Sequence, residues 1–337
     1  MSQLPRPQHA CVIAMVLAAC STASPARRPD IATAGHAVRE GQLDAGGGIS
    51  IGYRIAGTGP DTLIVIHGGP GFTLDYLAED LEPLAARHTV IFYDQRGSGR
   101  STLVSDSAQL TGERFADDLE ALRRHFRLER LNLLGHSWGP GVIALYAQKH
   151  PERLGRLLIV SGLPLTRAGL VESFTRMAAS RDSGELRGMD AAMTARQANP
   201  ADPAPCRAYY AIWFRPFFAD TSSALRTKGD ICAGSAESRR NKMQSVDRFT
   251  FASLGDWDWR PLMRTVQAPT LVIHGTEDPL LLVHGREWAA TLPNSRLLVL
   301  DDIGHFPYVE APERFFPPVE TFLSGEWPAG AVQVPAR

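Results

Sequence analysis

The sequence predicts an α/β fold: a mostly parallel central sheet with helices on both faces and an inserted helical cap. Short apolar runs recur from about residue 38, each bounded by Gly or polar turns, as is typical of strands buried on both faces. Helical patterns separate these runs, and strands that alternate with helices form parallel sheets. The alternation stops between residues 164 and 262, where the periodicity is helical, and this interruption predicts the cap.

The expected elements follow in chain order. We expect strands at Ile49–Ala56, Thr62–Ile66, Thr89–Tyr93, Leu131–Leu134, Leu157–Val160, Thr270–Ile273 and Arg296–Leu300. We expect helices at about Leu74–Arg87, Ser107–Phe126, Trp138–His150, Gly285–Thr291 and Pro312–Leu323. The predicted α/β core is therefore 38–163 and 263–325, the cap is 164–262, and 326–337 is a C-terminal tail.

Composition narrows the class of partner. The 337 residues include Lys+Arg 35 and Asp+Glu 36, a net charge of −1, which argues against a basic nucleic-acid surface. A hydrophobic fraction of 44% is typical of a globular protein. No Cys/His spacing is typical of a metal site, and we expect no cofactor.

The N-terminus predicts export. Arg6 precedes the apolar run Ala10–Ala19, which is shorter than the roughly 20 residues of a membrane span and fits a signal peptide. Leu17–Cys20 resembles a bacterial lipobox, so residues 1–20 are expected to be a lipoprotein signal, with Cys20 lipidated and 21–37 a flexible tether. Ser21 favours the outer membrane, on its periplasmic side. The alternative is a plain signal peptide with an incidental cysteine.

Two cysteines, Cys206 and Cys232, remain after Cys11 is removed and Cys20 is lipidated. An oxidising periplasm would allow them to form a disulfide. Two separate buried thiols are the alternative, and the sequence leaves both open.

The segment Gly135–Gly139 reads Gly-His-Ser-Trp-Gly and matches G-x-S-x-G. It lies between a predicted strand and a predicted helix, the context in which this motif presents a nucleophilic serine on a sharp turn. Ser137 is therefore the candidate nucleophile. The alternative is a glycine-rich turn with an incidental serine.

A serine nucleophile needs a base, and the base needs an orienting acid. Asp278 and His305 each follow a predicted strand, at the edge where parallel sheets place their sites. Glu277 is an alternative acid. His274 and His284 are lesser candidates for the base, and His274 also fits a buried core position.

An oxyanion needs hydrogen-bond donors. The N–H of Trp138 follows the nucleophile, and the N–H of Gly69 lies in the glycine-rich segment His67–Gly71 after a predicted strand. We expect His67 to brace this loop. The segment Asp94–Ser101 is expected to hold a tight turn beside the site, and direct contact with substrate is its alternative role.

These motifs together resemble the α/β-hydrolase superfamily, and specifically its proline iminopeptidase (prolyl aminopeptidase) branch. The resemblance covers about 38–163 and 263–325. It implies a serine hydrolase that releases N-terminal residues from small peptides, so the partner it implies is a small-molecule or short-peptide substrate. Pro140 is a mild departure from the branch. A larger departure is the missing W-x-x-W-E segment, whose glutamate binds the substrate amine in that branch; the nearest counterpart, Tyr209–Phe218, is aromatic and lacks it.

Substrate recognition remains open at this stage. Asp220, Asp230 and Glu237 are the candidate partners for a substrate amine, and each also fits a solvated surface position. The aromatic segment Tyr209–Phe218 is either a wall of the substrate pocket or the core of the cap. A carboxylesterase or lactonase would use the same catalytic residues. A non-catalytic binding protein is a remote alternative, and epoxide hydrolases and dehalogenases are disfavoured because they need a carboxylate nucleophile.

Overall fold

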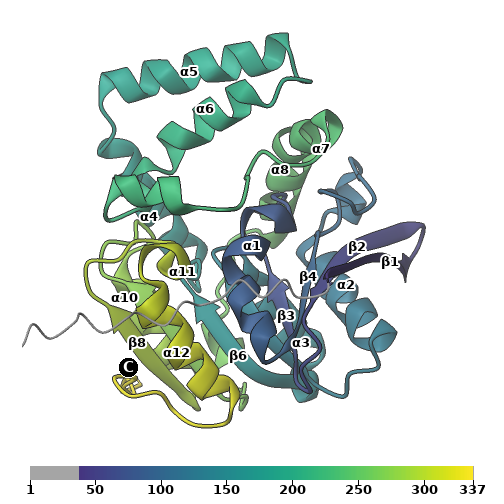
Figure 1. The fold of residues 1–337 in the computed structure, drawn as a ribbon, viewed down its shortest axis with the longest axis vertical. Coiled ribbons are helices and arrows are strands. Elements are labelled where there is room, and N and C mark those ends of the chain that lie inside the picture. Colours follow the sequence, from purple (N-terminus) through teal and green to yellow (C-terminus); the bar gives the residue numbers. More distant parts are fainter. Residues whose placement is uncertain (1–37, 337) are drawn as a thin grey trace, which may run out of the picture. The chain divides into compact units, whose positions relative to one another are not determined.

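The computed structural model describes residues 38–336, and its central feature is an eight-stranded sheet (Figure 1). The strand order is β1-β2-β4-β3-β5-β6-β7-β8; β3 to β8 run parallel, whereas β2 is antiparallel to both neighbours. The strands are β1 (Val38–Gly46), β2 (Ile49–Ala56), β3 (Thr62–Ile66), β4 (Thr89–Tyr93), β5 (Leu131–His136), β6 (Leu154–Val160), β7 (Thr270–Gly275) and β8 (Ser295–Leu300). The predicted mostly parallel sheet is confirmed.

Strand β1 is the strand that the sequence analysis missed. It pairs with β2 through the turn at Gly46–Gly48 and forms one edge of the sheet. Most of its side chains are exposed, so its sequence contains no apolar run. The predicted strands otherwise match the observed ones or fall short of them by a few residues at an end.

Helices of the α/β core connect the strands. They are η1 (Leu74–Tyr76), α1 (Ala78–Leu81), η2 (Glu82–Ala86), η3 (Ser107–Gln109), α2 (Gly112–His125), α3 (Gly139–Lys149), η4 (Pro151–Arg153), α10 (Leu282–Thr291), α11 (Pro307–Glu310) and α12 (Pro312–Leu323). The single helix expected at 74–87 is instead three short helical pieces. Pro83 lies in this segment, and because it has no N–H it cannot continue a regular helical hydrogen-bond ladder.

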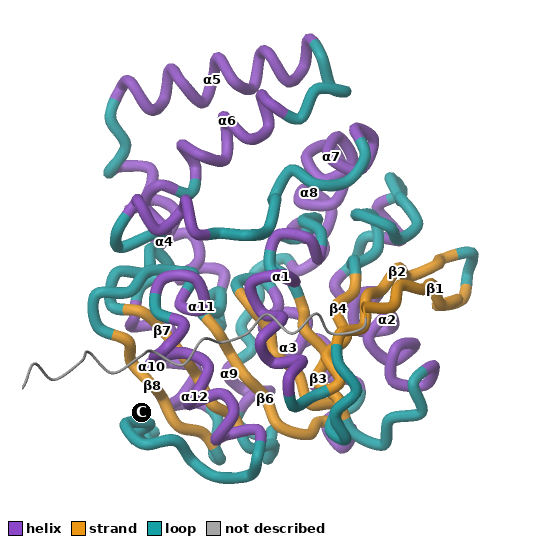
Figure 2. Tube along the Cα trace, viewed as in Figure 1, coloured by secondary structure: helices purple, strands orange, loops and turns teal. Residues whose placement is uncertain are grey.

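The pleat of the sheet divides the core into two layers. On β3, Ile64 and Ile66 belong to one apolar cluster, which includes buried residues of α2, α3 and α10. Leu63 and Val65 point to the other cluster, which includes residues of α1 and α12. Helices therefore cover both faces, as strands buried on both sides require (Figure 2).

Between β6 and β7 the chain is helical, apart from an isolated bridge of Thr166 with Asp258. The elements of this segment are α4 (Arg167–Ala179), α5 (Ser183–Ala198), α6 (Ala204–Trp213), η5 (Arg215–Phe217), η6 (Thr221–Arg226), α7 (Ala236–Asn241), the π-helix η7 (Lys242–Val246), α8 (Asp247–Leu254) and α9 (Arg260–Met263). Four of its helices, α5 to α8, lie together at the top of the view in Figure 1. Cys206 and Cys232 form a disulfide within this segment.

The structure describes the C-terminal end of the chain up to residue 336, whereas its description at the N-terminal end begins at residue 38. The predicted signal, Cys20 and the tether lie outside the described residues. Within residues 38–336 we find no helix that is long and apolar enough to cross a membrane. In the predicted C-terminal tail, Val332 pairs with Leu297 of β8 through two backbone hydrogen bonds of 2.8 and 2.9 Å.

Candidate active site

Ser137 occupies a sharp turn between β5 and α3. Its φ of 59° lies in the left-handed region, which is strained for a residue with a side chain. A Cβ on Gly135 would lie 2.7 Å from the backbone nitrogen of Pro140, so a larger residue there would push the turn apart. The Ser137 N–H donates to Val160 O at 3.1 Å, and the Ser137 carbonyl accepts from Leu163 N at 2.8 Å. The turn is thus held on both sides, with the Ser137 side chain partly exposed.

Asp278 and His305 meet at the carboxyl ends of β7 and β8. His305 Nδ1 lies 3.0 Å from each carboxylate oxygen of Asp278, and both side chains are buried. Burial alone would raise the pKa of Asp278, but the facing rings of His305 and His274 lower this pKa well below its usual range. Asp278 is therefore ionised and orients the imidazole so that Nε2 is the nitrogen left for proton transfer.

The structure brings the three predicted residues to one edge of the sheet. The ring of His136, which directly precedes Ser137, lies 4.8 Å from the ring of His305, centroid to centroid. A Cβ built on Gly68 would lie 3.3 Å from Ser137 Oγ, so the glycine-rich loop after β3 borders the same hydroxyl. A serine, an imidazole with its carboxylate, and a glycine-rich loop therefore lie at the same edge of the sheet.

The alternative acid and bases differ from Asp278 and His305 in their surroundings. The Glu277 side chain is exposed. His274 is buried below Asp278, with Nε2 3.6 Å from Asp278 Oδ2, and burial lowers its pKa. His284 Nδ1 lies 3.9 Å from Glu287 Oε2 on α10. In this geometry Asp278 is the carboxylate that faces His305.

The two predicted oxyanion donors lie on loops beside Ser137. Gly69 has a φ of 124°, which glycine adopts without strain, and Trp138 lies directly before α3. The neighbouring Gly68 N–H is already used, because it donates to Tyr76 Oη at 2.7 Å. Within residues 38–336 the N–H groups of Gly69 and Trp138 have no acceptor, so both remain able to bind a negatively charged oxygen.

The loop after β3 is tied to the loop after β4. His67 Nε2 accepts from Gln95 N at 3.1 Å, and His67 Nδ1 lies 2.7 Å from Gly68 O. Burial lowers the pKa of His67 to about 4, so its ring is neutral at neutral pH. Asp94 accepts from Leu74 N at 2.7 Å and from Arg100 N at 2.8 Å. These contacts give His67 and the segment Asp94–Ser101 a role in holding the two loops together.

The segment between β6 and β7 contacts His305 directly. The His305 N–H donates to Phe217 O at 2.7 Å, and the two rings lie 5.0 Å apart. Glu310 accepts from Gly304 N at 3.0 Å and from Ala219 N at 2.8 Å, which ties the loop of the base to the segment above it. Directly after α6, Phe214 contacts Phe306 with ring centroids 5.6 Å apart. The aromatic segment Tyr209–Phe218 therefore packs against the site and within its own layer.

The three candidate amine partners lie in different surroundings. Asp230 forms an ion pair with Arg207 at 2.7 Å and accepts from Cys232 N at 2.9 Å. Asp220 caps η6 by accepting from Ser222 N at 2.9 Å. Glu237 is exposed in the first turn of α7. Their carboxylates are thus engaged or in solvent.

A further acid, Asp247, was missed by sequence reasoning. Its carboxylate pairs with the buried Lys242, whose Nζ lies 4.4 Å from the centroid of the Phe72 ring. Lys242 Cγ would lie 2.9 Å from a Cβ on Gly71, so the pair sits over the glycine-rich loop. Burial raises the pKa of Asp247, which Lys242 partly offsets. The π-helix η7 creates this i,i+5 pairing, and the sequence holds no signal for it.

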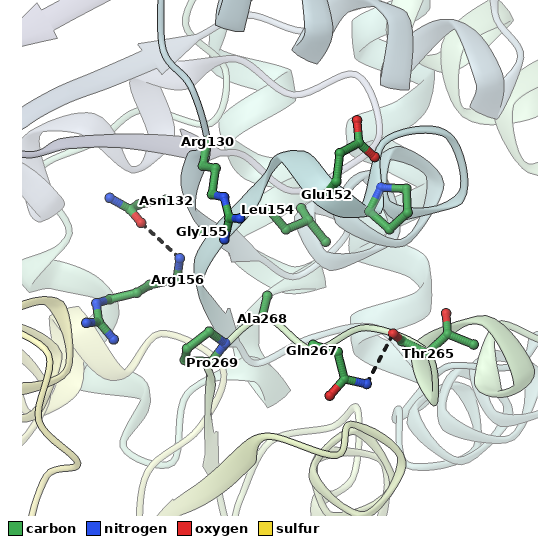
Figure 3. A pocket seen from close by; sticks show the side chains of 11 residues that line it. Arg130, Asn132, Glu152, Leu154, Gly155, Arg156, Thr265, Gln267, Ala268 and Pro269 are labelled. Carbon is green, nitrogen blue, oxygen red and sulfur yellow. Dashed lines mark hydrogen bonds between the residues drawn. The ribbon is translucent and has the colours of Figure 1, made fainter.

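A hollow of about 510 Å³ lies at the opposite edge of the sheet, where β6 and β7 begin (Figure 3). Asn132 and Arg156 line it, and Asn132 Oδ1 accepts from Arg156 N at 2.9 Å. It is therefore separate from the site around Ser137. In the described part of the chain no three His, Cys, Asp or Glu side chains gather as they would around a metal ion.

Comparison with known proteins gives one family. A model of the alpha/beta hydrolase fold matches residues 61–312. A proline iminopeptidase of Lactobacillus helveticus is 26% identical over 80% of this chain and 93% of that protein. The crystal structure of a proline iminopeptidase from Mycobacterium smegmatis has a TM-score of 0.63 and 25% identity, over 85% of this chain and 98% of that one. An enol-lactonase from Burkholderia xenovorans has a TM-score of 0.59 and 21% identity, over 84% and 99%. The chain belongs to the alpha/beta hydrolase fold family.

Proposed function

We propose that this protein is a serine hydrolase that works through an acyl-enzyme, with Ser137 as nucleophile, His305 as general base and Asp278 as the orienting acid. Ser137 Oγ attacks the substrate carbonyl while His305 Nε2 takes the hydroxyl proton. Gly69 N–H and Trp138 N–H stabilise the oxyanion, and His305 then protonates the leaving group. Water hydrolyses the acyl-enzyme by the same steps. The observation that supports this most is the His305–Asp278 hydrogen bond beside the strained Ser137 turn.

The proposed substrates are short peptides, from which the enzyme releases N-terminal residues in the manner of a proline iminopeptidase. The similarity to proline iminopeptidases over most of the chain supports this choice. The aromatic rings of Phe214 and Phe217 over the His305 loop suit a compact apolar residue such as proline.

Such an aminopeptidase must bind a substrate ammonium group, and a buried ammonium needs a carboxylate partner. We assign this role to Asp247 rather than to Asp220, Asp230 or Glu237. Asp247 is partly exposed and lies on the segment above the glycine-rich loop. Lys242 binds its Oδ2, which leaves Oδ1 to accept from the substrate.

Hydrolysis of small esters or lactones is the second candidate function. One observation favours it: Lys242 already pairs with Asp247, so a substrate ammonium group would have to share this carboxylate with the lysine. The same catalytic residues would cleave an ester without any amine partner. A panel of proline β-naphthylamide, other aminoacyl amides and short-chain p-nitrophenyl esters separates the two, because an esterase would cleave only the esters.

We also propose that the protein is exported and anchored to the periplasmic side of the outer membrane through lipidated Cys20. The Cys206–Cys232 disulfide supports export, because disulfides persist in oxidising compartments. Replacement Cys20→Ser should move the protein from the membrane fraction to the soluble periplasm. An unchanged membrane fraction would refute the anchor.

A further inference from the structure

A chain of hydrogen bonds passes through His136, the residue before Ser137, and joins three loops of the site. Gly68 N lies 2.7 Å from Tyr76 Oη, and Tyr76 Oη lies 2.8 Å from His136 Nδ1. His136 Nε2 lies 2.9 Å from His305 O. Tyr76, His136 and His305 are all buried. The chain therefore links the glycine-rich loop, the serine turn and the loop of the base.

The two ends of this chain determine where its protons lie. Gly68 N–H can only donate, and the His305 carbonyl can only accept. His136 Nε2 must therefore carry a proton, so its Nδ1 accepts and Tyr76 donates to it. Burial, with the facing His305, lowers the pKa of His136 to about 3, so the neutral ring that this pattern needs is present at neutral pH. The Tyr76 hydroxyl and both ring nitrogens of His136 then each have a hydrogen-bond partner.

Gly68 has no side chain to anchor it, and a larger residue would not fit at this position. Its backbone is therefore held by the hydrogen bond from its N–H to Tyr76. A Cβ on Gly68 would lie 2.7 Å from Tyr76 Oη and 2.9 Å from Ser137 Cβ. The loop therefore approaches the nucleophile as bare backbone, and Tyr76 Oη sets where its N–H points. Gly69, the proposed oxyanion donor, is the next residue.

We propose that Tyr76 and His136 are positioning residues, which hold Gly69 N–H and His305 at a fixed separation across Ser137. Each end of the chain is directly adjacent to a reacting group: Gly68 precedes Gly69, and the carbonyl that His136 binds belongs to His305 itself. Small displacements of groups that act in the transition state are costly to the rate. This proposal rests on the proposed hydrolase function of the same site.

The variant Tyr76→Phe removes the hydroxyl at the centre of the chain. We expect kcat to fall about 10- to 100-fold with KM within twofold of the wild type, since the groups displaced act in the transition state. The affinity for a boronic acid, which forms a tetrahedral adduct on the serine, should fall in parallel with kcat. If Tyr76 were needed only for stability, Tyr76→Phe would lower the thermal unfolding midpoint without lowering kcat at an unchanged KM.

Tyr308→Phe is the matched control. The Tyr308 ring also packs on His136, with centroids 5.3 Å apart, and within residues 38–336 its buried hydroxyl has no hydrogen-bond partner. We expect its kcat to equal that of the wild type. Equal kcat values for Tyr76→Phe and Tyr308→Phe would overturn the proposal, as would a rise in KM with kcat unchanged.

A second pair of variants decides the matter should Tyr76→Phe not fold. The amide of His136→Gln offers an acceptor and a donor on one group, and it should retain more of kcat than His136→Leu, which offers neither. Equal losses in these two variants would contradict the positioning role. Failure of the hydrolase proposal gives a different result, because Ser137→Ala would then keep the wild-type activity.

Discussion

Both carboxylate oxygens of Asp278 lie 3.0 Å from Nδ1 of His305, although 27 residues separate the two in the chain. Strands β7 and β8 are neighbours and parallel, so the loops after them emerge side by side. Leu280 N donates to Asp278 Oδ1 at 2.9 Å and gives the carboxylate a second partner. The pair is thus built before any substrate arrives, with its imidazole held in one orientation.

Replacing Asp278 by asparagine tests whether the site needs the negative charge of this carboxylate. In Asp278→Asn we expect kcat to fall by about 10⁴-fold with little change in fold, because the amide stabilises the wrong imidazole tautomer and no imidazolium. Steady-state kinetics on the best substrate of the panel measures this. The matched control is Glu277→Gln, whose exposed side chain does not face His305 and whose kcat should stay at the wild-type value. A larger loss in Glu277→Gln than in Asp278→Asn would reverse the assignment of the acid.

The buried pair of Arg96 and Asp118 should matter for stability. Arg96 Nε and Nη2 lie 2.7 and 2.6 Å from the two carboxylate oxygens of Asp118, and both side chains are almost fully buried. Arg96→Ala leaves a buried carboxylate without its partner, so we expect the free energy of unfolding to fall by about 3–5 kcal/mol. Urea unfolding measures the loss. Arg114→Ala breaks an exposed pair with Asp117 and should cost less than about 1 kcal/mol; equal losses would contradict this account.

The buried His136 should make stability depend on pH. Its folded pKa is about 3, lowered first by burial and then by the facing His305, while Asp278 acts in the opposite direction. An unfolded histidine titrates near its ordinary value of about 6.5, so between these two values the unfolded state binds more protons. Stability from this residue is therefore complete above about pH 6.5 and declines as the pH falls.

Urea unfolding of wild type and His136→Gln at several pH values isolates this contribution. The wild type should lose stability relative to the variant by up to about 1.4 kcal/mol for each pH unit between pH 6 and 4. A difference between the two proteins that stays constant over this range would show that His136 is not buried as a neutral ring.

Amine recognition by Asp247 gives a test of specificity. Asp247→Asn should weaken the binding of aminoacyl amides and so raise their KM. The expected loss of binding free energy is roughly 2–5 kcal/mol, the range typical of a broken buried charge pair. Hydrolysis of a neutral p-nitrophenyl ester should hardly change, and this ester also reports that the variant folds. The variants Asp220→Asn and Glu237→Gln, whose side chains are exposed, serve as surface controls. Unchanged amide cleavage in Asp247→Asn, or ester cleavage alone in the wild type, would favour the esterase.

The sequence was sufficient for elements whose environment shapes their composition. Strands β3 and β4 are buried on both faces, so each is a continuous apolar run with boundaries that can be read directly. Strand β1 lies at an edge and is largely exposed, and its sequence therefore looks like a loop. The turn around Ser137 was readable because only glycine fits beside it.

Contacts between residues that lie far apart in the chain could not be predicted from the sequence. Tyr76 lies 60 residues before His136 in the chain, and His305 lies 169 residues after it, so only the assembled sheet brings the three together. The position of Asp247 relative to Lys242 depends on a π-helical turn, whose five-residue spacing an ordinary helical pattern does not predict.

The reactivity of Ser137 is the most direct test of the account. A fluorophosphonate probe should label the wild type on the peptide that contains Ser137, as mass spectrometry can establish, and Ser137→Ala should remain unlabelled. The same variant should lose about 10⁶-fold in kcat, the size typical of removing such a nucleophile. Labelling of Ser137→Ala at the wild-type rate, or a loss of only several-fold in its turnover, would contradict the central claim that this serine is the nucleophile.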